Sequence, residues 1–494
     1  MNGRQRGALL VAGTTSDAGK SVLTTGICRW LRRNGVSVAP FKAQNMSNNS
    51  MVTSDGAEIG RAQWIQAVAA GAEPEAAMNP VLLKPGSDRR SHVLLMGQPY
   101  GELDASSFSG ARPVLAETAY AAFDDLAGRY DVVVCEGAGS PTEINLREHD
   151  FVNMGLAQHG QVPTVVVGDI DRGGVFAAMY GTLKLMPEPD QALVKGFVVN
   201  TFRGDESLLA PGLRMIEEAT QRPVLGVVPW LPGLWLDSED ALDLEGRRAR
   251  DATGEVLRVA VVRFPRISNF TDVDALAVEP NVDVRFVDGP DAVHEADLVV
   301  LPGSRATLDD LAWLRERGLE GALVERHRGG EPILGICGGF QMLGEHLADP
   351  ESVESGSAAS AVGLGVLPVR TRFAREKSLG RPRGSALGEE VSGYEVHHGE
   401  VTVRGGEPFL GGCRDGASWG TLWHGVLEND GFRRAFLTQV AVDAHRTGWE
   451  VHEDTEFGRR RDQRIEALAD AVEEHLDTDA LLDIISSGAQ GSST

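Results

Sequence analysis

Short apolar runs alternate with longer amphipathic stretches along most of the chain. In the first half, each apolar run is bounded by glycine, proline or polar residues, as is typical of strands buried in a parallel sheet. A helix is expected over residues 21–35, with Gly35 at its end. This alternation of strand and helix predicts an α/β domain over residues 1–235. The expected strands cover residues 7–13, 36–42, 130–139, 163–171 and 194–202.

A second set of apolar runs follows a charge-rich segment. Residues 236–256 lack strand periodicity, and we interpret them as a linker between domains. Beyond the linker, residues 308–330 have a helical pattern. The chain is therefore predicted to contain two α/β domains with parallel sheets, the second over residues 257–450. The strands expected in the second domain cover residues 257–264, 282–288, 296–303 and 332–339.

Less regular patterns fill the rest of the chain. Residues 352–361 have the composition of a flexible loop. Residues 460–486 have an amphipathic pattern that predicts one helix or a pair of helices, and residues 486–494 resemble a frayed tail. We therefore expect a C-terminal helical extension and tail over residues 451–494.

Composition narrows the range of partners. The chain has 494 residues and a formal net charge of −24, so it should repel nucleic acid and anionic membranes. The basic run Arg459–Arg461 lies close to Glu456 and Asp462 and is interpreted as a solvated helix face. No apolar stretch approaches the roughly 20 residues of a membrane helix. The four cysteines have neither metal-ligand nor disulfide spacing, and no signal peptide is evident, which favours a cytoplasmic location.

A glycine-rich turn between the first strand and the first helix has the setting of a phosphate-binding loop. Backbone N–H groups of such a loop hold phosphates, a lysine contacts the outer phosphates, and a hydroxyl reaches Mg²⁺. The spacing departs from the standard pattern, because Thr14 stands where the first glycine would be, and the alternative interpretation is a chance turn. The predicted ATP-binding residues of this loop are Gly13, Thr14, Thr15, Ser16, Asp17, Ala18, Gly19, Lys20 and Ser21.

Oxygen ligands for Mg²⁺ are expected close to this loop. Besides Ser21, Glu136 lies just beyond a predicted strand, and Asp55 is a second candidate that could also be an ordinary turn residue. Asp17 lies inside the loop, where it would contact substrate or a second metal ion, or cap the helix. Lys42 ends the second predicted strand, where it either adds positive charge against the phosphates or is a surface lysine.

A second glycine-rich turn carries a cysteine. The segment from Gly335 to Gly339 places Cys337 between small residues after a predicted strand, as in the strand–turn–helix elbow that presents a nucleophile. Because a helix N-terminus favours the thiolate, Cys337 is predicted to be a nucleophile rather than a buried structural cysteine.

Cysteine hydrolysis of an amide also needs a general base. His424, in the segment GTLWHGVLEN, follows Cys337 in the chain and is the expected base. His397 and His398 compete with it on sequence alone, and both could be half-buried structural histidines.

An oxyanion hole is the third requirement of this chemistry. The segment LPGSRAT follows a predicted strand, and the backbone N–H groups of Gly303 and Ser304 are the expected donors. The alternative is a plain turn between a strand and a helix. Gly338, next to the cysteine, and Gln341, on the elbow helix, are expected to line the same pocket.

These motifs resemble the class I, or triad-type, glutamine amidotransferases. The resemblance rests on GICGGFQML, the later WHG and the preceding LPGSRAT. Ordinary members have a glutamate two residues after the histidine, whereas here Gly425 and Val426 follow His424. This departure resembles a Cys–His branch found in cobyrinate amidation, and Glu428 is one candidate to orient His424.

The N-terminal segments resemble a narrower family. The lengthened phosphate loop is similar to that of a branch containing dethiobiotin synthetase and the cobyrinate-amidating enzymes. Together with the motifs that follow it, the chain resembles the glutamine-hydrolysing cobyric acid synthases from about residue 7 to residue 480. The motifs are, in chain order, FKAQNMSNNSMVTSDGAEIGRAQ (41–63), MNPVLLKP (78–85), CEGAGSPTEINL (135–146), DIDRGGVFA (169–177), NTFRGD (200–205) and RFPRISNFTD (263–272).

This resemblance implies a reaction and its substrates. Adenosylcobyrinic acid a,c-diamide would be amidated at its b, d, e and g carboxylates. Each step would consume ATP and glutamine and would require Mg²⁺. Asn200 would contact the adenine, and the corrin would meet the loops 43–50 and 140–147. The rival functions are amidation of other carboxylates, such as a and c or those of a cell-wall lipid precursor, and a regulatory ATPase of the partitioning type.

Overall fold

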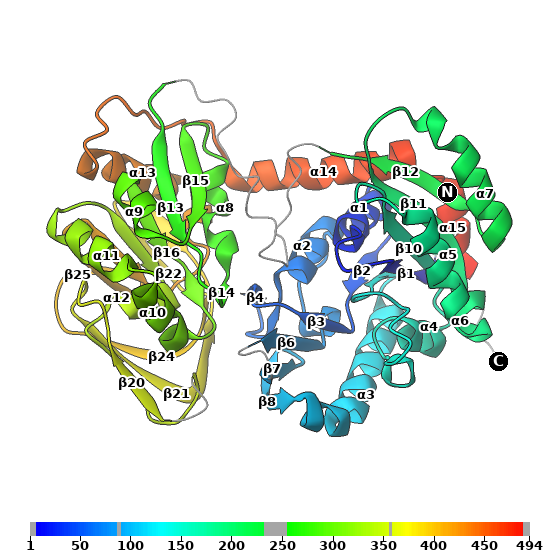
Figure 1. Ribbon diagram of the computed structural model, residues 1–494, viewed down its shortest axis with the longest axis horizontal. Coiled ribbons are helices and arrows are strands. Elements are labelled where there is room, and N and C mark those ends of the chain that lie inside the picture. The colour runs from blue at the N-terminus through cyan, green and yellow to red at the C-terminus, as the bar shows by residue number, and fades with distance from the viewer. Residues whose placement is uncertain (1–5, 86–89, 232–253, 355–357, 488–494) are drawn as a thin grey trace.

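The computed structural model describes residues 6–85, 90–231, 254–354 and 358–487, which form two lobes (Figure 1). The N-terminal lobe is built on a six-stranded sheet in the order β12-β11-β10-β1-β9-β2, in which every neighbouring pair is parallel. Five of these strands match the expected ones closely, whereas β12 was not predicted. Their bounds are β1 Gly7–Gly13, β2 Val38–Phe41, β9 Val132–Glu136, β10 Thr164–Asp169, β11 Val194–Phe202 and β12 Val224–Pro229.

The central strand β1 explains why the apolar runs lack alternation. Leu10 packs in one buried cluster and Leu9 in another, so both faces of the sheet are covered by helices. The first face carries α3, α4 and α5, and the second carries α1 and α2. The helices of this lobe are α1 Lys20–Arg33, α2 Arg61–Ala70, α3 Ala105–Arg129, α4 Met154–Gly160, α5 Val175–Leu185, α6 Glu188–Leu193 and α7 Ala210–Thr220.

The C-terminal lobe has a seven-stranded sheet in the order β15-β13-β16-β18-β27-β26-β25. The first five strands are parallel, and β26 and β25 add an antiparallel edge. The apolar pattern predicted neither this edge nor its neighbour β27. The strands are β13 Leu257–Val262, β15 Val282–Val287, β16 Leu298–Leu301, β18 Ile333–Ile336, β25 Glu407–Phe409, β26 Gly412–Asp415 and β27 Ser418–Thr421. The helices are α8 Asp274–Ala277, α9 Pro290–Glu295, α10 Thr307–Glu316, α11 Leu319–Arg328, α12 Gly338–Leu343 and α13 Asp430–Asp443.

Two expectations for this lobe were wrong in detail. The single helical stretch predicted over residues 308–330 is two helices, because Gly318 takes a left-handed conformation (φ 76°) between α10 and α11. The loop predicted over residues 352–361 contains strand β20 (Ala359–Val362), which pairs with β19 (His346–Asp349). Backbone pairing with β19 overrides the loop-like composition of that segment.

Each lobe also has smaller sheets, and one hairpin of the N-terminal lobe packs against the C-terminal lobe. In the N-terminal lobe they are β3 Gln44–Met46, β6 Val81–Pro85, β7 Arg90–Leu95 and β8 Gln98–Asp104, with the separate hairpin β4 Ser50–Val52 and β5 Glu58–Gly60. In the C-terminal lobe, β21 Val369–Gly380 and β24 Glu395–Val403 extend the β19–β20 sheet, and β14 Ile267–Ser268, β17 Gly303–Ser304, β22 Arg383–Ala386 and β23 Glu389–Ser392 form two short pairs. Met51 and Val52 pack against Tyr394 and Val396, so the hairpin rests on the C-terminal lobe.

The C-terminal extension is a pair of helices, α14 Phe457–His475 and α15 Thr478–Ser487. In Figure 1, α14 runs from the C-terminal lobe back to the N-terminal lobe, where it lies against α1. Arg33 of α1 pairs with Glu466 and Asp470, and Val472 joins the cluster that covers the second face of the sheet. Most of the predicted linker (236–256) and nearly all of the predicted tail lie outside the described residues.

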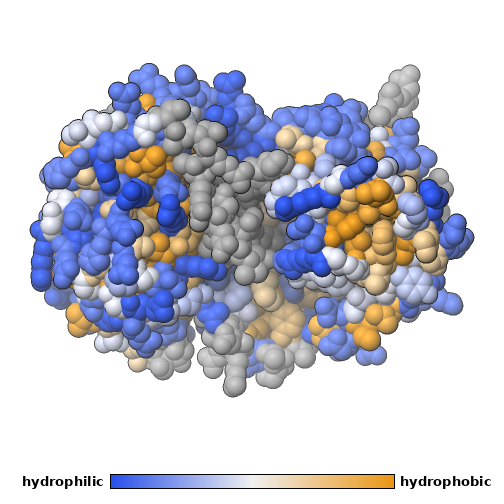
Figure 2. Space-filling view, turned by 45° about the horizontal axis from the view of Figure 1, so that its top comes forward, coloured by the Kyte–Doolittle hydropathy of each residue, from blue (hydrophilic) through white to orange (hydrophobic). Residues whose placement is uncertain are grey.

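Hydrophilic residues cover most of the left-hand lobe in Figure 2, whereas the right-hand lobe also shows a patch of hydrophobic residues on this face. None of the described helices is both long and apolar enough to cross a membrane. The basic run Arg459–Arg461 is only partly a solvated face, because Arg461 pairs with Glu428 and stacks over Trp64.

Candidate active sites in the two lobes

The phosphate loop connects β1 to α1, as predicted. Lys20 is buried, and its ammonium group donates to the carbonyl oxygens of Thr15 and Ser16, both at 2.9 Å, and of Gly139 at 3.2 Å. Gly19 has a left-handed conformation (φ 95°), and a Cβ there would lie 2.0 Å from Nδ2 of Asn200. Only glycine therefore fits at this position.

Glu136 gathers the other predicted residues of this site. Its carboxylate is buried and accepts hydrogen bonds from Ser21 Oγ at 2.8 Å, Lys42 Nζ at 2.9 Å and Gln66 Nε2 at 2.5 Å. Burial opposes its ionisation, but Lys42, Gln66 and Ser21 outweigh burial and hold the pKa of Glu136 below its ordinary value. Lys42 is thus buried against the site and is not a surface lysine. Gln66, on α2, was not predicted.

The remaining N-terminal candidates lie in different places. Asn200 donates to the carbonyl oxygen of Ala18 at 3.1 Å, so it packs against the phosphate loop. Asp17 forms an ion pair with Arg172 at 2.9 Å, a partner that the sequence did not identify. Asp55 is exposed in the turn between β4 and β5 and accepts a hydrogen bond from Thr53. The prediction that Asp55 joins Ser21 and Glu136 is wrong in this structure, because the hairpin directs this residue to its own turn.

Cys337 lies at the sharp turn between β18 and α12. Its backbone has φ 49° and ψ −109°, a combination that strains a residue with a side chain. A Cβ at Gly339 would lie 2.0 Å from the carbonyl oxygen of Leu301, and one at Gly338 would lie 2.8 Å from the backbone nitrogen of Ser304. The flanking glycines therefore allow the elbow to press against β16 and β17.

His424 is paired with an aspartate that sequence reasoning missed. Oδ2 of Asp272 lies 2.6 Å from Nδ1 of His424, and its other oxygen accepts from the backbone N–H of Gly425 at 2.8 Å. Burial disfavours the imidazolium, but the charges of Asp272 and of the Cys337 sulfur outweigh it and raise the pKa of His424 to about 10. The ring of Tyr394 stacks on that of His424 with centroids 5.2 Å apart.

The competing side chains have other partners. Glu428 forms ion pairs with Arg61 at 2.7 Å and Arg461 at 3.0 Å, so the suggestion that Glu428 orients His424 is wrong. Burial, helped by nearby positive charge, lowers the pKa of His397 to about 4 and that of His398 to about 3. Asp272 ends the segment RFPRISNFTD, which was noted as a family motif but not as the source of the third residue.

Some of the expected pocket residues line one cavity, whereas Gly303, Gly338 and His424 are not among its lining residues. Cys337, Ser304 and Gln341 all line it. Gln341 is buried, and its Nε2 has no hydrogen-bond partner within the described part of the chain, so it is available to a ligand. Ser304 Oγ donates to the buried carboxylate of Asp310 at 2.5 Å, which fixes the strand β17 beside the elbow.

Known families match both lobes. Residues 9–242 match the family described as "CobQ/CobB/MinD/ParA nucleotide binding domain", and residues 258–432 match "CobB/CobQ-like glutamine amidotransferase domain". The chain is 62% identical over 479 residues to a cobyric acid synthase of Mycobacterium ulcerans, covering 96% of each chain. It is 60% identical over 488 residues to a cobyric acid synthase of Mycobacterium tuberculosis, covering 97% of each.

The fold, the two sites and these matches define a glutamine amidotransferase that carries its own nucleotide-binding domain. At this identity over nearly the whole length, the chain belongs to the cobyric acid synthase family. It is thus an enzyme of cobalamin biosynthesis that uses ATP and small-molecule substrates.

Proposed function

We propose that this enzyme converts adenosylcobyrinic acid a,c-diamide to adenosylcobyric acid by amidating its b, d, e and g carboxylates. The observation that carries the proposal is the presence in one chain of an ionised Glu136 beside a phosphate loop and of a Cys337–His424–Asp272 arrangement. The first suits activation of a carboxylate by ATP, and the second suits release of ammonia from glutamine.

The N-terminal site would activate the carboxylate. Backbone N–H groups of the loop and Lys20 bind the phosphates, while the Ser21 hydroxyl and the Glu136 carboxylate offer the hard oxygen ligands that suit Mg²⁺. When bound, Mg²⁺ would neutralise charge on the phosphates. Lys42, buried at the same edge, adds positive charge where the transferred phosphoryl group develops negative charge. The product of this step is an acyl phosphate, which ammonia can attack.

The C-terminal site would supply that ammonia. The Cys337 thiolate attacks the amide carbon of glutamine, and the oxyanion that forms accepts hydrogen bonds from the backbone of Gly303 and Ser304. His424 gives its proton to the departing nitrogen, so ammonia leaves and a thioester remains. His424 then takes a proton from water, whose oxygen attacks the thioester and frees glutamate. Asp272 keeps the imidazole in the orientation and tautomer that these transfers need.

A cavity beside the phosphate loop suits the corrin periphery. It has a volume of about 190 Å³ and is lined by Gln44, Phe108, Arg112 and several of the residues between 138 and 153. Part of the loop 140–147 faces the cavity, which supports the proposal that this loop contacts the corrin. Asn45 is instead buried and donates to Gln63 at 2.8 Å, so its substitution would disturb packing and would not test substrate contact. Gln44→Ala is the better probe, and we expect it to raise the KM for the corrinoid more than the KM for ATP.

Mass spectrometry tests the whole proposal. The protein is incubated with the a,c-diamide, ATP, Mg²⁺ and glutamine, and four successive amide-forming mass shifts are expected. Absence of any shift would overturn the proposal, and turnover of a different acid in its place would support a rival function. Cys337→Ala should abolish amidation from glutamine but spare amidation from added ammonium at raised pH. Lys20→Ala should lose both.

A further inference from the structure

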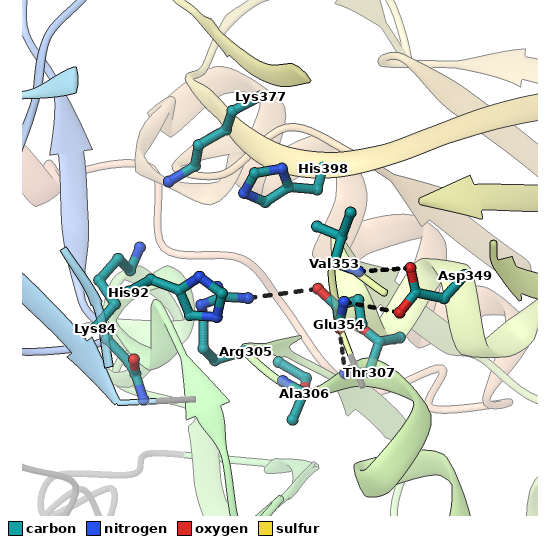
Figure 3. Close-up of polar contacts among 12 residues, drawn as sticks. Lys84, His92, Arg305, Ala306, Thr307, Asp349, Val353, Glu354, Lys377 and His398 are labelled. Carbon is teal, nitrogen blue, oxygen red and sulfur yellow. Dashed lines mark hydrogen bonds and ion pairs between the residues drawn. The ribbon is translucent and has the colours of Figure 1, made fainter. Parts of the chain in front are cut away.

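The cavity that holds Cys337 extends to the boundary between the lobes. Its lining includes Cys337 and Gln341. It also includes the side chains of Arg305, Lys377, His398 and Lys84. Three of these come from the C-terminal lobe, whereas Lys84 comes from β6 of the N-terminal lobe. Figure 3 shows these four side chains converging on one region, with His92 beside them.

A single buried carboxylate joins the two lysines. Glu58, on β5, is fully buried and accepts hydrogen bonds from Lys84 at 2.6 Å and from Lys377 through its other oxygen. Arg305 pairs with the buried Glu354 at 3.5 Å. Among the residues that line the cavity, Lys84, Arg305 and Lys377 are cations and Glu354 is a carboxylate, so the cavity wall carries more positive than negative charge.

The neighbouring histidines do not add to that positive charge. Burial, together with Arg305, His398 and the two lysines, lowers the pKa of His92 to about 2. Burial and Lys377 lower the pKa of His398 to about 3, so both rings are neutral at ordinary pH. His92 has a carboxylate partner of its own, Glu102, at 3.2 Å on the more exposed side.

An uncompensated buried cation is costly unless an anion joins it. Glutamine has a group that suits each set of side chains. Its amide must reach Cys337, and its α-carboxylate is an anion that would then lie in the same cavity as the cations.

We propose that Arg305 and Lys377 bind the α-carboxylate of glutamine, and that Lys84 and Glu58 of the N-terminal lobe hold Lys377 in place for this role. The glutaminase pocket is then completed by the synthetase lobe. This inference rests on the proposed glutaminase function of Cys337, and it adds the residues that distinguish glutamine from other primary amides.

The test compares two amides in steady-state glutaminase assays of the full-length enzyme. One is glutamine, and the other is 4-aminobutanamide, which has the same side-chain amide but lacks the α-carboxylate. Lys377→Met should lower kcat/KM for glutamine by about 30-fold or more, mainly through KM, and should change kcat/KM for 4-aminobutanamide by less than about threefold. Lys377→Arg should restore most of the loss, and Lys84→Met should cause a smaller loss.

Two controls make the outcome decisive. Arg370→Met removes an exposed cation of the same strand, which pairs with Glu345, and should leave both amides unaffected. Amidation from ammonium should remain intact in Lys377→Met, which shows that the lobes still fold. An unchanged KM for glutamine, or equal losses for both amides, would overturn the subsite. Failure of the wild-type enzyme to hydrolyse glutamine at all would instead overturn the proposed function.

Discussion

Asp272 and His424 are 152 positions apart in the chain, yet their side chains meet at 2.6 Å beside Cys337. Asp272 lies in the short helical turn that follows β14, and His424 follows β27. Two strands that are far apart in the sequence of the lobe therefore bring the side chains together. The amidotransferase site therefore has an acidic residue, but one that precedes the nucleophile in sequence.

The first prediction concerns this aspartate. Asp272→Asn removes the charge that favours the imidazolium and permits the wrong tautomer, so glutamine-dependent amidation should fall by roughly 10²–10⁴-fold. Amidation from ammonium should change little, because the N-terminal site is untouched. Parallel assays with the two nitrogen sources check this, and equal loss from both would show that the substitution acts on folding.

The second prediction concerns stability and pH. The pKa of His424 is raised in the folded protein from its ordinary 6.5 to about 10, so the protonated form is favoured by folding. Its contribution to the free energy of unfolding is complete below about pH 6.5 and is lost as the pH rises towards 10. The stability difference between wild type and Asp272→Asn should therefore shrink from pH 6 to pH 10. Urea unfolding at several pH values measures it, and a constant difference would contradict the assignment.

The third prediction concerns Glu136. Glu136→Gln keeps the shape of the side chain but removes the charge that pairs with Lys42 and that suits Mg²⁺. We expect amidation to fall by roughly 10²-fold or more from either nitrogen source, with a higher Mg²⁺ concentration needed for half-maximal rate. Glutaminase activity of Cys337 should persist. Glu218→Gln, an exposed change on α7, is the matched control.

The fourth prediction separates Glu428 from Asp272. Glu428 joins Arg61 of α2 to Arg461 of α14, so Glu428→Gln should lower the free energy of unfolding by roughly 1–3 kcal/mol. Because Glu428 does not contact His424, the rate of glutamine hydrolysis per folded molecule should stay within about threefold of wild type. A loss as large as that of Asp272→Asn would restore Glu428 as the orienting residue.

The fifth prediction tests the elbow. Gly339→Ala places a methyl group against the carbonyl oxygen of Leu301, and because that backbone is fixed in the sheet, we expect a loss of about 1–3 kcal/mol. Gly321→Ala, in the first turn of α11 with nothing within 4 Å of the added methyl group, should be neutral or stabilising. Denaturation midpoints of the two variants check the contrast.

The sequence predicted what local patterns determine. Buried parallel strands are continuous apolar runs, so β11 was predicted at its observed bounds and the turns holding Lys20 and Cys337 were placed between the right elements. Site residues that come from distant parts of the chain were harder to predict. Gln66 and Asp272 reach their sites only through tertiary contacts, and no spacing relates them to Glu136 or His424.

The same limit explains the misplaced residues. Asp55 and Glu428 both lie within motifs and carry the expected negative charge. Asp55 instead accepts a hydrogen bond within its own hairpin turn, and Glu428 forms ion pairs with two arginines. The antiparallel edge β25–β26 is short and polar, and its strands form because β27 offers a free edge to pair with. Charge and composition predict the chemistry available, whereas the partner of each side chain depends on the assembled fold.

The return of α14 and α15 to the N-terminal lobe has a consequence for protein synthesis. Gly7 lies so close to α15 that a Cβ there would be 2.0 Å from the carbonyl oxygen of Ile485. At about 5–20 residues per second, a ribosome needs roughly 25–95 s to pass from Leu9 to Ile485. During that time one apolar face of the first sheet has no α14 or α15 to cover it. The nascent N-terminal lobe should therefore be a client of chaperones until the last helices emerge.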